Sequence, residues 1–268
     1  MDTKLLRQKI LDLAIKGKLV KQNPADEPAS VLLEKIRKEK QKLIKDGKIK
    51  KDKNESFIFR GSDNLHYEKF TNGFENPNNW QLTTLGELVY IINGVSYNKN
   101  DVKNNGIRIL RGGNIHNGQI LLLDNDVFLP AQYFDNDKTV KKNDIIIVAS
   151  TGSMEVIGKP GFAVSNMKNI QIGAFLRIVR PINQEIASYC KVIFQSNVYR
   201  RHIRRLVKGT NINNIRSNYI TDLIFPLPPL PEQKRIVKAI EQAFEKITEI
   251  ETNKKELEEL ADKVKAKT

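Results

Sequence analysis

The stretch PLPPLPEQKRIVKAI, residues 226–240, decides the fold, because four prolines are followed directly by a charged run with helical periodicity. Proline holds the backbone extended and cannot pair within a central strand. Pro231 can nonetheless start a helix, since its missing N–H is not needed in the first turn. The stretch therefore predicts a stiff joint between a globular domain that ends at residue 228 and a helix over residues 229–268.

That helix carries a narrow apolar seam whose positions follow each other at alternating spacings of four and three residues. The seam consists of Ile236, Ile240, Ala243, Ile247, Ile250, Lys254, Leu257, Ala261 and Val264. A sustained spacing of this kind is typical of a coiled coil, and the rod would be about 50 Å long at ~1.5 Å per residue. The seam favours a partner helix, with packing on the chain's own domain as the alternative. Lys254 would weaken packing but could fix register or orientation.

Residues 1–47 predict a pair of helices upstream of the globular domain. Apolar side chains recur at helical spacing in DTKLLRQKILDLAIKG, and Gly17 is a plausible stop. Pro28 is well placed in the first turn of the second helix, which carries Leu32, Leu33 and Ile36. Residues 48–78 are mostly polar and predict a linker.

Residues 79–228 predict one compact domain in which short strands are separated by Gly, Asn and Asp turns. The apolar runs are LGELVYIING, IRILRG, QILLL, NDIIIVAS, QIGAFLRIVRP and ITDLIFPL. One helix, roughly Ile186–Val207, interrupts them. The whole chain is therefore expected to be α+β, with a mixed α/β domain, a long C-terminal helix and an N-terminal helical pair.

The charge of the chain points to a polyanionic partner. The 268 residues carry a net charge of +14 with a pI near 9.7, and each cation that neutralises a phosphate releases a counterion. The basic residues are uneven: residues 1–53 hold 16 basic and 8 acidic side chains, whereas residues 229–268 hold nine of each. The C-terminal helix therefore resembles a rod with mixed-sign faces more than a phosphate-binding arm. A protein that is merely basic is the alternative.

Other bulk features exclude several classes of protein. The single cysteine, Cys190, excludes an internal disulfide and a Cys-rich zinc site, and the three histidines lack ligand spacing. No apolar run approaches the roughly 18–20 residues that span a membrane, and the N-terminus lacks the core of a signal peptide. The chain is expected to be cytoplasmic, without a metal site and without contact to a membrane.

The strongest binding signal is a basic segment that contains seven Lys and Arg residues and no acid between Ile186 and Thr221. Two Gly-rich loops, in IRILRGGNIHNGQI and VASTGSMEVIGKPG, add hydrogen-bonding side chains. Lys and Arg suit phosphates, while Asn and Arg can bind adenine and guanine edges. The DNA-binding candidates are Arg111, Asn114, Ser150, Thr151, Ser153, Lys159, Arg201, Arg204, Arg205, Lys208, Thr210, Asn211, Asn213, Asn214 and Arg216. A solvated helix face with ordinary tight connections is the alternative.

The segments that resemble catalytic motifs each depart from the motif in spacing or in residue type. GSMEVIGKP resembles a phosphate loop, but Gly152 and Gly158 are one residue too far apart and Pro160 replaces the magnesium-binding hydroxyl. Asp144, Glu155 and Lys159 could suggest a nuclease cluster, yet their spacing is wrong and NDIIIVAS is more simply a buried strand. We expect no catalytic residues, and a self-contained nuclease or methyltransferase is the competing hypothesis.

The order of these parts resembles the specificity (S) subunit of Type I restriction–modification systems over nearly the whole chain. The similar segments are LLRQKILDLAIKGKLVKQNPADEPASVLLEKIRKEK, NNWQLTTLGEL, KNDIIIVASTGS and KGTNINNIRSNYITDLIFPLPPLPEQKRIVKAI. The resemblance implies a subunit that reads double-stranded DNA through a target recognition domain, residues 79–228, attached to a conserved spacer helix, residues 229–268. It implies methyltransferase (M) and restriction (R) partner subunits, which would use S-adenosylmethionine, ATP and Mg²⁺; no cofactor is expected in this chain.

The sequence departs from the family pattern because it holds one recognition domain and one spacer helix. We expect a half-length subunit, natural or truncated, that forms a two-fold homodimer through the seam. Such a dimer would recognise a palindromic split site. A non-functional truncated specificity cassette is the alternative.

The N-terminal helical pair is expected to pack around the base of the rod and to help dock the M subunit.

Overall fold

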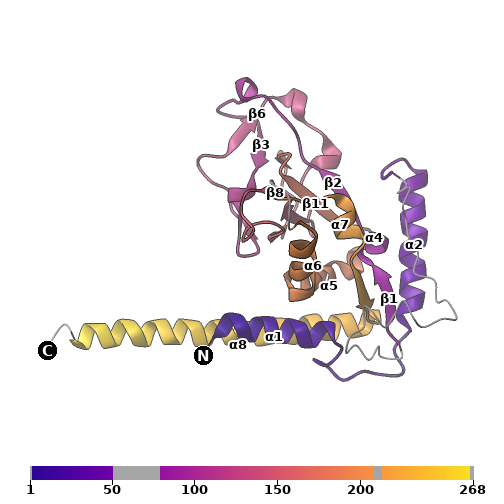
Figure 1. Cartoon of the computed structure of the whole chain (residues 1–268), viewed down its shortest axis with the longest axis vertical. Coiled ribbons are helices and arrows are strands. Elements are labelled where there is room, and N and C mark those ends of the chain that lie inside the picture. The colour runs from indigo at the N-terminus through magenta and orange to yellow at the C-terminus, as the bar shows by residue number, and fades with distance from the viewer. Residues whose placement is uncertain (1, 51–78, 208–212, 266–268) are drawn as a thin grey trace.

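A long helix, α8 (Leu230–Lys265), extends from an α+β body in the computed structural model, which describes residues 2–50, 79–207 and 213–265 (Figure 1). We call the segment from β1 (Gln81–Thr84) to β13 (Ile224–Leu227) the body, and α8 the rod. The predicted α+β class, with N-terminal helices and a long C-terminal helix, is confirmed. Most of the predicted linker, residues 51–78, lies outside the described residues.

Helix α1 (Thr3–Ile15) lies along the first part of the rod and runs antiparallel to it (Figure 1). The Arg7 guanidinium donates to Thr248 Oγ1 at 2.8 Å and pairs with Glu251 at 3.0 Å, while its cation lies 5.0 Å from the centre of the Phe244 ring. Gly17, with a φ of 65°, follows the helix as predicted.

The apolar seam of the rod divides into an inner and an outer half. Ile236, Ile240 and Ile247 are buried within the chain and Ala243 is half-buried, whereas Ile250, Lys254, Leu257 and Ala261 are exposed. The prediction that the whole seam faces a partner helix is therefore wrong for the inner half, because α1 and α5 of the same chain already contact the rod there. The side chain of Val264 lies outside the described part of the chain.

The two N-terminal helices pack in different places. Helix α2 (Ala29–Lys45) stands against the body beside α4 (Leu85–Leu88), not along the rod (Figure 1). Arg37 pairs with the buried Glu87 at 2.6 Å, and Lys40 donates to the Gly86 carbonyl at 2.9 Å. The prediction that both helices surround the base of the rod is therefore correct for α1 and wrong for α2.

The body is organised around a four-stranded antiparallel sheet with the strand order β2-β11-β7-β9. Its strands are β2 (Val89–Asn93), β11 (Leu176–Pro181), β7 (Ile145–Val148) and β9 (Pro160–Phe162). Along β7, Ile145 and Ile147 face one apolar core and Ile146 and Val148 face the other. A strand buried on both faces explains why its sequence is continuously apolar.

Smaller sheets complete the body. In the three-stranded sheet, β3 (Ile107–Leu110) pairs in parallel with β10 (Ile170–Ile172) and antiparallel with β6 (Val127–Leu129). Two-residue strands form two further pairs: β4 (Ile115–His116) with β5 (Gln119–Ile120), and β8 (Ser150–Thr151) with β12 (Asn213–Asn214). Each of the six predicted apolar runs contains a strand.

Two predicted elements differ from the structure. The single helix predicted at Ile186–Val207 is two helices, α5 (Ala187–Gln195) and α6 (Asn197–Val207). Ser196 breaks them, because its hydroxyl donates to the Ile193 carbonyl at 2.6 Å and accepts the Tyr199 N–H at 3.4 Å, which caps α6. The run LGELVYIING begins as α4, and the run ITDLIFPL starts in α7 (Ser217–Thr221).

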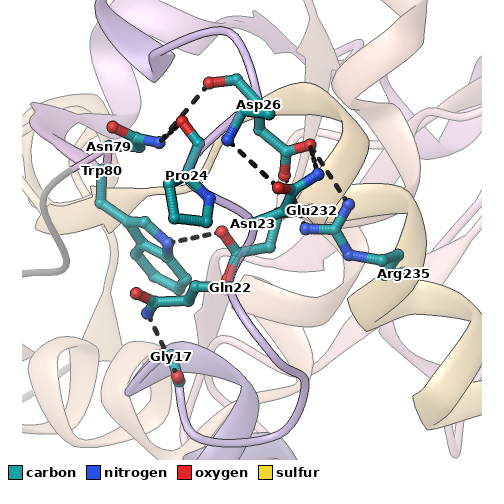
Figure 2. Close-up of polar contacts among 10 residues, drawn as sticks. Gly17, Gln22, Asn23, Pro24, Asp26, Asn79, Trp80, Glu232 and Arg235 are labelled. Atoms are coloured by element: carbon teal, nitrogen blue, oxygen red, sulfur yellow. Dashed lines mark hydrogen bonds and ion pairs between the residues drawn. The ribbon is translucent and has the colours of Figure 1, made fainter.

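Two polar contacts tie Trp80, just before the body, and Asp26, before α2, to the first turns of the rod, and Figure 2 shows them side by side. The Trp80 indole N–H donates to a carboxylate oxygen of Glu232 at 2.9 Å, and this hydrogen bond is buried. Arg235, one turn along the rod, pairs with Asp26 at 2.6 Å. Burial raises the pKa of the Glu232 carboxyl above its ordinary value, although Trp80 and Arg235 both favour its charged form.

The proline joint is also tied to the first turn of the rod. Gln233 donates through its side chain to the Pro228 carbonyl at 2.8 Å and through its backbone N–H to the Pro229 carbonyl at 2.9 Å. The two residues after the prolines thus make different contacts: Glu232 bonds to Trp80, and Gln233 bonds to the prolines.

No helix in the described part of the chain is long and apolar enough to cross a membrane.

Candidate nucleic-acid interface

Two predicted DNA-binding segments that are far apart in the sequence meet in a short ladder. Strand β8 pairs antiparallel with β12, so that Thr151 lies opposite Asn213 and Ser150 opposite Asn214. The Ile215 N–H extends the ladder by donating to the Ala149 carbonyl at 2.7 Å. The loop after β7 and the Asn-rich segment before α7 therefore form one polar surface.

The loop after β3 joins this surface through a third, intervening loop. The turn at residues 173–175, between β10 and β11, accepts the Ala149 and Ser150 N–H groups at the Phe175 carbonyl. On its other side, the Gly173 N–H donates to the Leu110 carbonyl at 2.8 Å. We call the loops 111–113, 149–154 and 173–175, together with segment 214–216, the recognition face.

Helix α6 adjoins the recognition face and presents arginines to solvent. Tyr199, Ile203 and Val207 are buried on one side of the helix, whereas Arg201 and Arg205 are exposed on the other. Because residues four apart lie on the same helix face, these two guanidinium groups form one basic patch. Arg205 has no acidic partner among the residues that the structure describes.

Two other arginines of α6 hold the loop instead of facing solvent freely. Arg200 donates to the Ile157 carbonyl and, at 3.1 Å, to the Glu155 carbonyl, while Arg204 pairs with the Glu155 carboxylate at 3.1 Å. Arg204 is therefore a partly exposed arginine in a surface ion pair, and its contact with DNA stays a prediction. Both arginines brace loop 149–159 against α6.

Asn114 is not available for DNA. Its side chain is 1 % exposed, and it accepts the Arg111 N–H at 2.6 Å while donating to the Leu121 carbonyl and to Asp126. This prediction is wrong, because Asn114 stabilises its own turn. Arg111 is exposed at the recognition face, and its guanidinium donates to the Asn125 carbonyl at 2.8 Å.

The remaining candidates fall into three groups. Exposed or half-exposed on the described surface are Ser150, Thr151, Ser153, Lys159, Asn214 and Arg216. Asn213 is placed by its backbone only. Lys208, Thr210 and Asn211 lie outside the described residues. Among the first group, Thr151 accepts the Ser153 N–H at 3.2 Å, and the Arg216 cation lies 6.0 Å from the centre of the Tyr219 ring.

Geometry separates the residues that had suggested a nuclease. Asp144 is 0 % exposed and forms a bidentate pair with Arg180, with oxygen–nitrogen distances of 2.7 and 2.8 Å. Glu155, in contrast, lies exposed on the loop beside α6. The carboxylates therefore serve separate ion pairs, and the described residues contain no group of acids, histidines and cysteines that could hold a metal ion.

Burial also lowers the pKa of two basic side chains near the recognition face. His202 on α6 has its pKa lowered, chiefly because burial penalises its charged form, and its Nε2 lies 2.9 Å from the Tyr219 carbonyl. Burial likewise lowers the pKa of Arg177, whose guanidinium donates to the Ala174 and Leu176 carbonyls. An arginine remains charged throughout the physiological range.

The fold and the recognition face together define a basic α+β domain that is attached to a long helix and has polar loops and arginines on one surface. The chain belongs to the family described as the Type I restriction modification DNA specificity domain, whose model matches residues 77–259. This membership confirms the resemblance found in the sequence.

Several relatives resemble most of the chain. The chain is 30 % identical over 250 residues to the specificity subunit of the Type I restriction enzyme EcoAI from Escherichia coli. These residues make up 90 % of this chain and 39 % of the relative. Over 169 residues it is 30 % identical to the EcoKI specificity subunit from Escherichia coli strain K12, covering 62 % and 36 %. The chain thus spans less than half the length of these relatives.

Solved structures share the fold. The HsdS subunit from Thermoanaerobacter tengcongensis superimposes with a TM-score of 0.52 at 18 % identity, covering 84 % of this chain and 50 % of that one. A chain from a structure of the type I R-M system, concerned with complex assembly and conformational transition, gives a TM-score of 0.53 at 19 % identity, covering 85 % and 53 %.

Proposed function

We propose that this chain reads one half of a bipartite DNA target as the specificity component of a Type I restriction–modification enzyme. The observation that carries the proposal is the β8–β12 ladder, which gathers Ser150, Thr151 and Asn214 from distant segments onto one exposed surface. The arginines of α6 lie beside that surface. Hydrogen-bonding loops suit base edges and the arginines suit phosphates, so one face could supply both kinds of contact.

The chain would act without catalysis of its own. Its relatives are named as specificity subunits, and the carboxylate Asp144 is consumed in a buried ion pair. Methylation and cleavage would belong to M and R subunits, which would use S-adenosylmethionine, ATP and Mg²⁺. The chain would scaffold these subunits, with the rod and α1 forming the base on which they assemble.

The outer seam of the rod supports assembly into a homodimer. Ile250 is 45 % exposed and Leu257 is 66 % exposed, and Leu260 is exposed beside them. Apolar side chains at heptad spacing on an isolated helix gain stability by packing against a second helix. A two-fold dimer would place the same seam on both sides of the interface, and its two bodies would read a palindromic split site.

Selection from a random duplex library tests the reading function. The purified chain should enrich one short sequence, or its two-fold repeat, without metal or S-adenosylmethionine. The affinity should fall as the salt concentration rises, because phosphate contacts release counterions. Recovery of unselected sequences only, or turnover of DNA by the chain alone, would contradict the proposal.

A further inference from the structure

Phe175 is a large apolar side chain held in solvent at the centre of the recognition face. It is 68 % exposed, although its neighbours Gly173 and Leu176 are buried. Its loop lies between Leu110, which precedes Arg111, and the Ala149–Ser150 segment. We propose that Phe175 is a specificity-determining residue whose ring contacts the bases of the DNA half-site. The inference rests on the proposed function and names a residue that neither charge nor hydrogen-bonding pattern indicates.

The backbone that carries the ring is fixed on both sides. The Phe175 carbonyl accepts two N–H groups, from Ala149 at 2.8 Å and from Ser150 at 3.0 Å. The Arg177 guanidinium donates to the Ala174 carbonyl at 2.7 Å and to the Leu176 carbonyl at 2.8 Å. Three successive carbonyls are therefore occupied, and the turn has little freedom to fold the ring inward.

Close packing beneath the turn adds to this rigidity. The Gly173 N–H donates to the Leu110 carbonyl at 2.8 Å, and Gly94 approaches so closely that a Cβ on it would lie 2.0 Å from the Gly173 oxygen. Backbone therefore fills the space between Gly94 and Gly173, so the turn cannot move closer to the end of β2. Since burying a Phe ring normally stabilises a fold, a rigid turn that keeps one in water points to a contact made on binding.

The neighbouring groups indicate duplex DNA as the ligand of this ring. Arg111 lies on one side of the turn, while Ser150 and Thr151 lie on the other, so the ring stands among cationic and hydrogen-bonding groups. Apolar side chains in such surroundings contact the thymine methyl group in the major groove or wedge against a base step. Because the ring is held in place before binding, little conformational freedom is lost when it meets the bases.

The test compares Phe175→Ala with Val164→Ala. Val164 is even more exposed, at 81 %, but it follows Ala163, which bonds to Asp144 and Asn143 at the opposite end of β7. On the duplex selected by the wild-type chain, Phe175→Ala should weaken binding on the order of tenfold or more, and Val164→Ala should leave it unchanged. On a random duplex, both variants should bind as the wild type does. Phe175→Trp should retain most of the preference.

The outcomes separate this inference from the function on which it rests. If the wild type selects no sequence, the proposed function fails. If it does select one and Phe175→Ala matches Val164→Ala, the ring has no role in reading. Equal losses on selected and random duplexes would also overturn the assignment. Thermal unfolding should give the same midpoint for all variants, because neither side chain is packed in a core.

Discussion

The indole of Trp80 and the carboxylate of Glu232 form a buried 2.9 Å hydrogen bond between residues 152 positions apart in the sequence. Trp80 directly precedes the first strand of the body, and Glu232 lies in the first turn of the rod. Figure 2 shows the bond next to the ion pair of Asp26 and Arg235. These two contacts link residues next to the body to the first turns of the rod, in addition to the packing of α5 on the rod.

Replacing Trp80 with Phe should destabilise this joint. The ring remains largely filled, but Glu232 loses its donor while its other oxygen already lacks a partner among the described residues. A buried acceptor left unpaired costs about 1–3 kcal/mol, which urea denaturation would measure as a lower free energy of unfolding. Glu232→Gln in the same background should recover part of the loss. Full stability of Trp80→Phe would show that the bond contributes nothing.

Breaking the buried ion pair of the body should cost more. Asp144→Asn leaves Arg180 buried without a counter-charge, so the free energy of unfolding should fall by about 3–5 kcal/mol. Lys255→Met removes the exposed pair with Glu259 and should change stability by less than about 0.5 kcal/mol. Similar effects of the two substitutions would refute the distinction between buried and surface pairs here.

The pH dependence of stability should carry a contribution from His202. Burial lowers its pKa in the folded state, so near pH 6 the unfolded chain binds more protons than the folded chain. The stabilising contribution is complete above the unfolded pKa of about 6.5 and is lost as the pH falls from there toward the folded pKa. The difference between the unfolding free energies at pH 7.5 and pH 5.5 should therefore be smaller in His202→Gln than in the wild type. In His116→Gln, a substitution at an exposed site, the difference should equal that of the wild type.

Arg205 and Arg216 should affect DNA binding differently. Arg205 projects from α6, where it suits a phosphate, so Arg205→Ala should weaken binding equally on all duplexes and lower the salt slope by about one. Arg216 is exposed on the recognition face, and Arg216→Ala should instead relax base preference. Affinities on cognate and random duplexes, each measured at several salt concentrations, separate the two effects. Equal losses for Arg216→Ala on both duplexes would argue against base contact.

The outer seam should control self-association. Leu257→Glu places a charge in the exposed seam, so sedimentation at micromolar concentration should show a monomer where the wild type forms a dimer. The variant should remain folded, because Leu257 is not packed within the chain. Lys263→Glu, on the exposed surface of the rod but outside the seam, is the matched control and should leave the dimer intact. A wild type that is strictly monomeric would refute the homodimer.

Much of the architecture could be predicted from the sequence, because its signals are local. Pro231 and the following periodicity indicate the rod, and the run of Ile145 to Val148 indicates a strand buried on both faces. The break at Ser196 was less visible, because apolar spacing continues across it while a single hydroxyl ends one helix and caps the next. The signal that could have located it was the Ser-Asn pair, which is typical of a helix start.

The candidate site was harder to predict, because it depends on long-range pairing. Composition selected Arg205 and Arg216 correctly as exposed cations, but it could not distinguish Asn114, which its own turn buries, or Arg204, which Glu155 pairs. The ladder that joins Thr151 to Asn213 has no local signal. Phe175 was missed for the same reason, since only the fold reveals that its ring is left out of the core.

Strands β1 and β13 pair from Gln81↔Leu227 to Thr84↔Ile224, which brings the entry and exit of the body together at the foot of the rod. A segment whose two ends meet in this way can be exchanged as a unit, since neither connection has to move. A different domain inserted between these two strands would connect to the rod in the same way. Under the proposed function, exchange of this segment would change the DNA sequence that is read and would leave the rod unchanged.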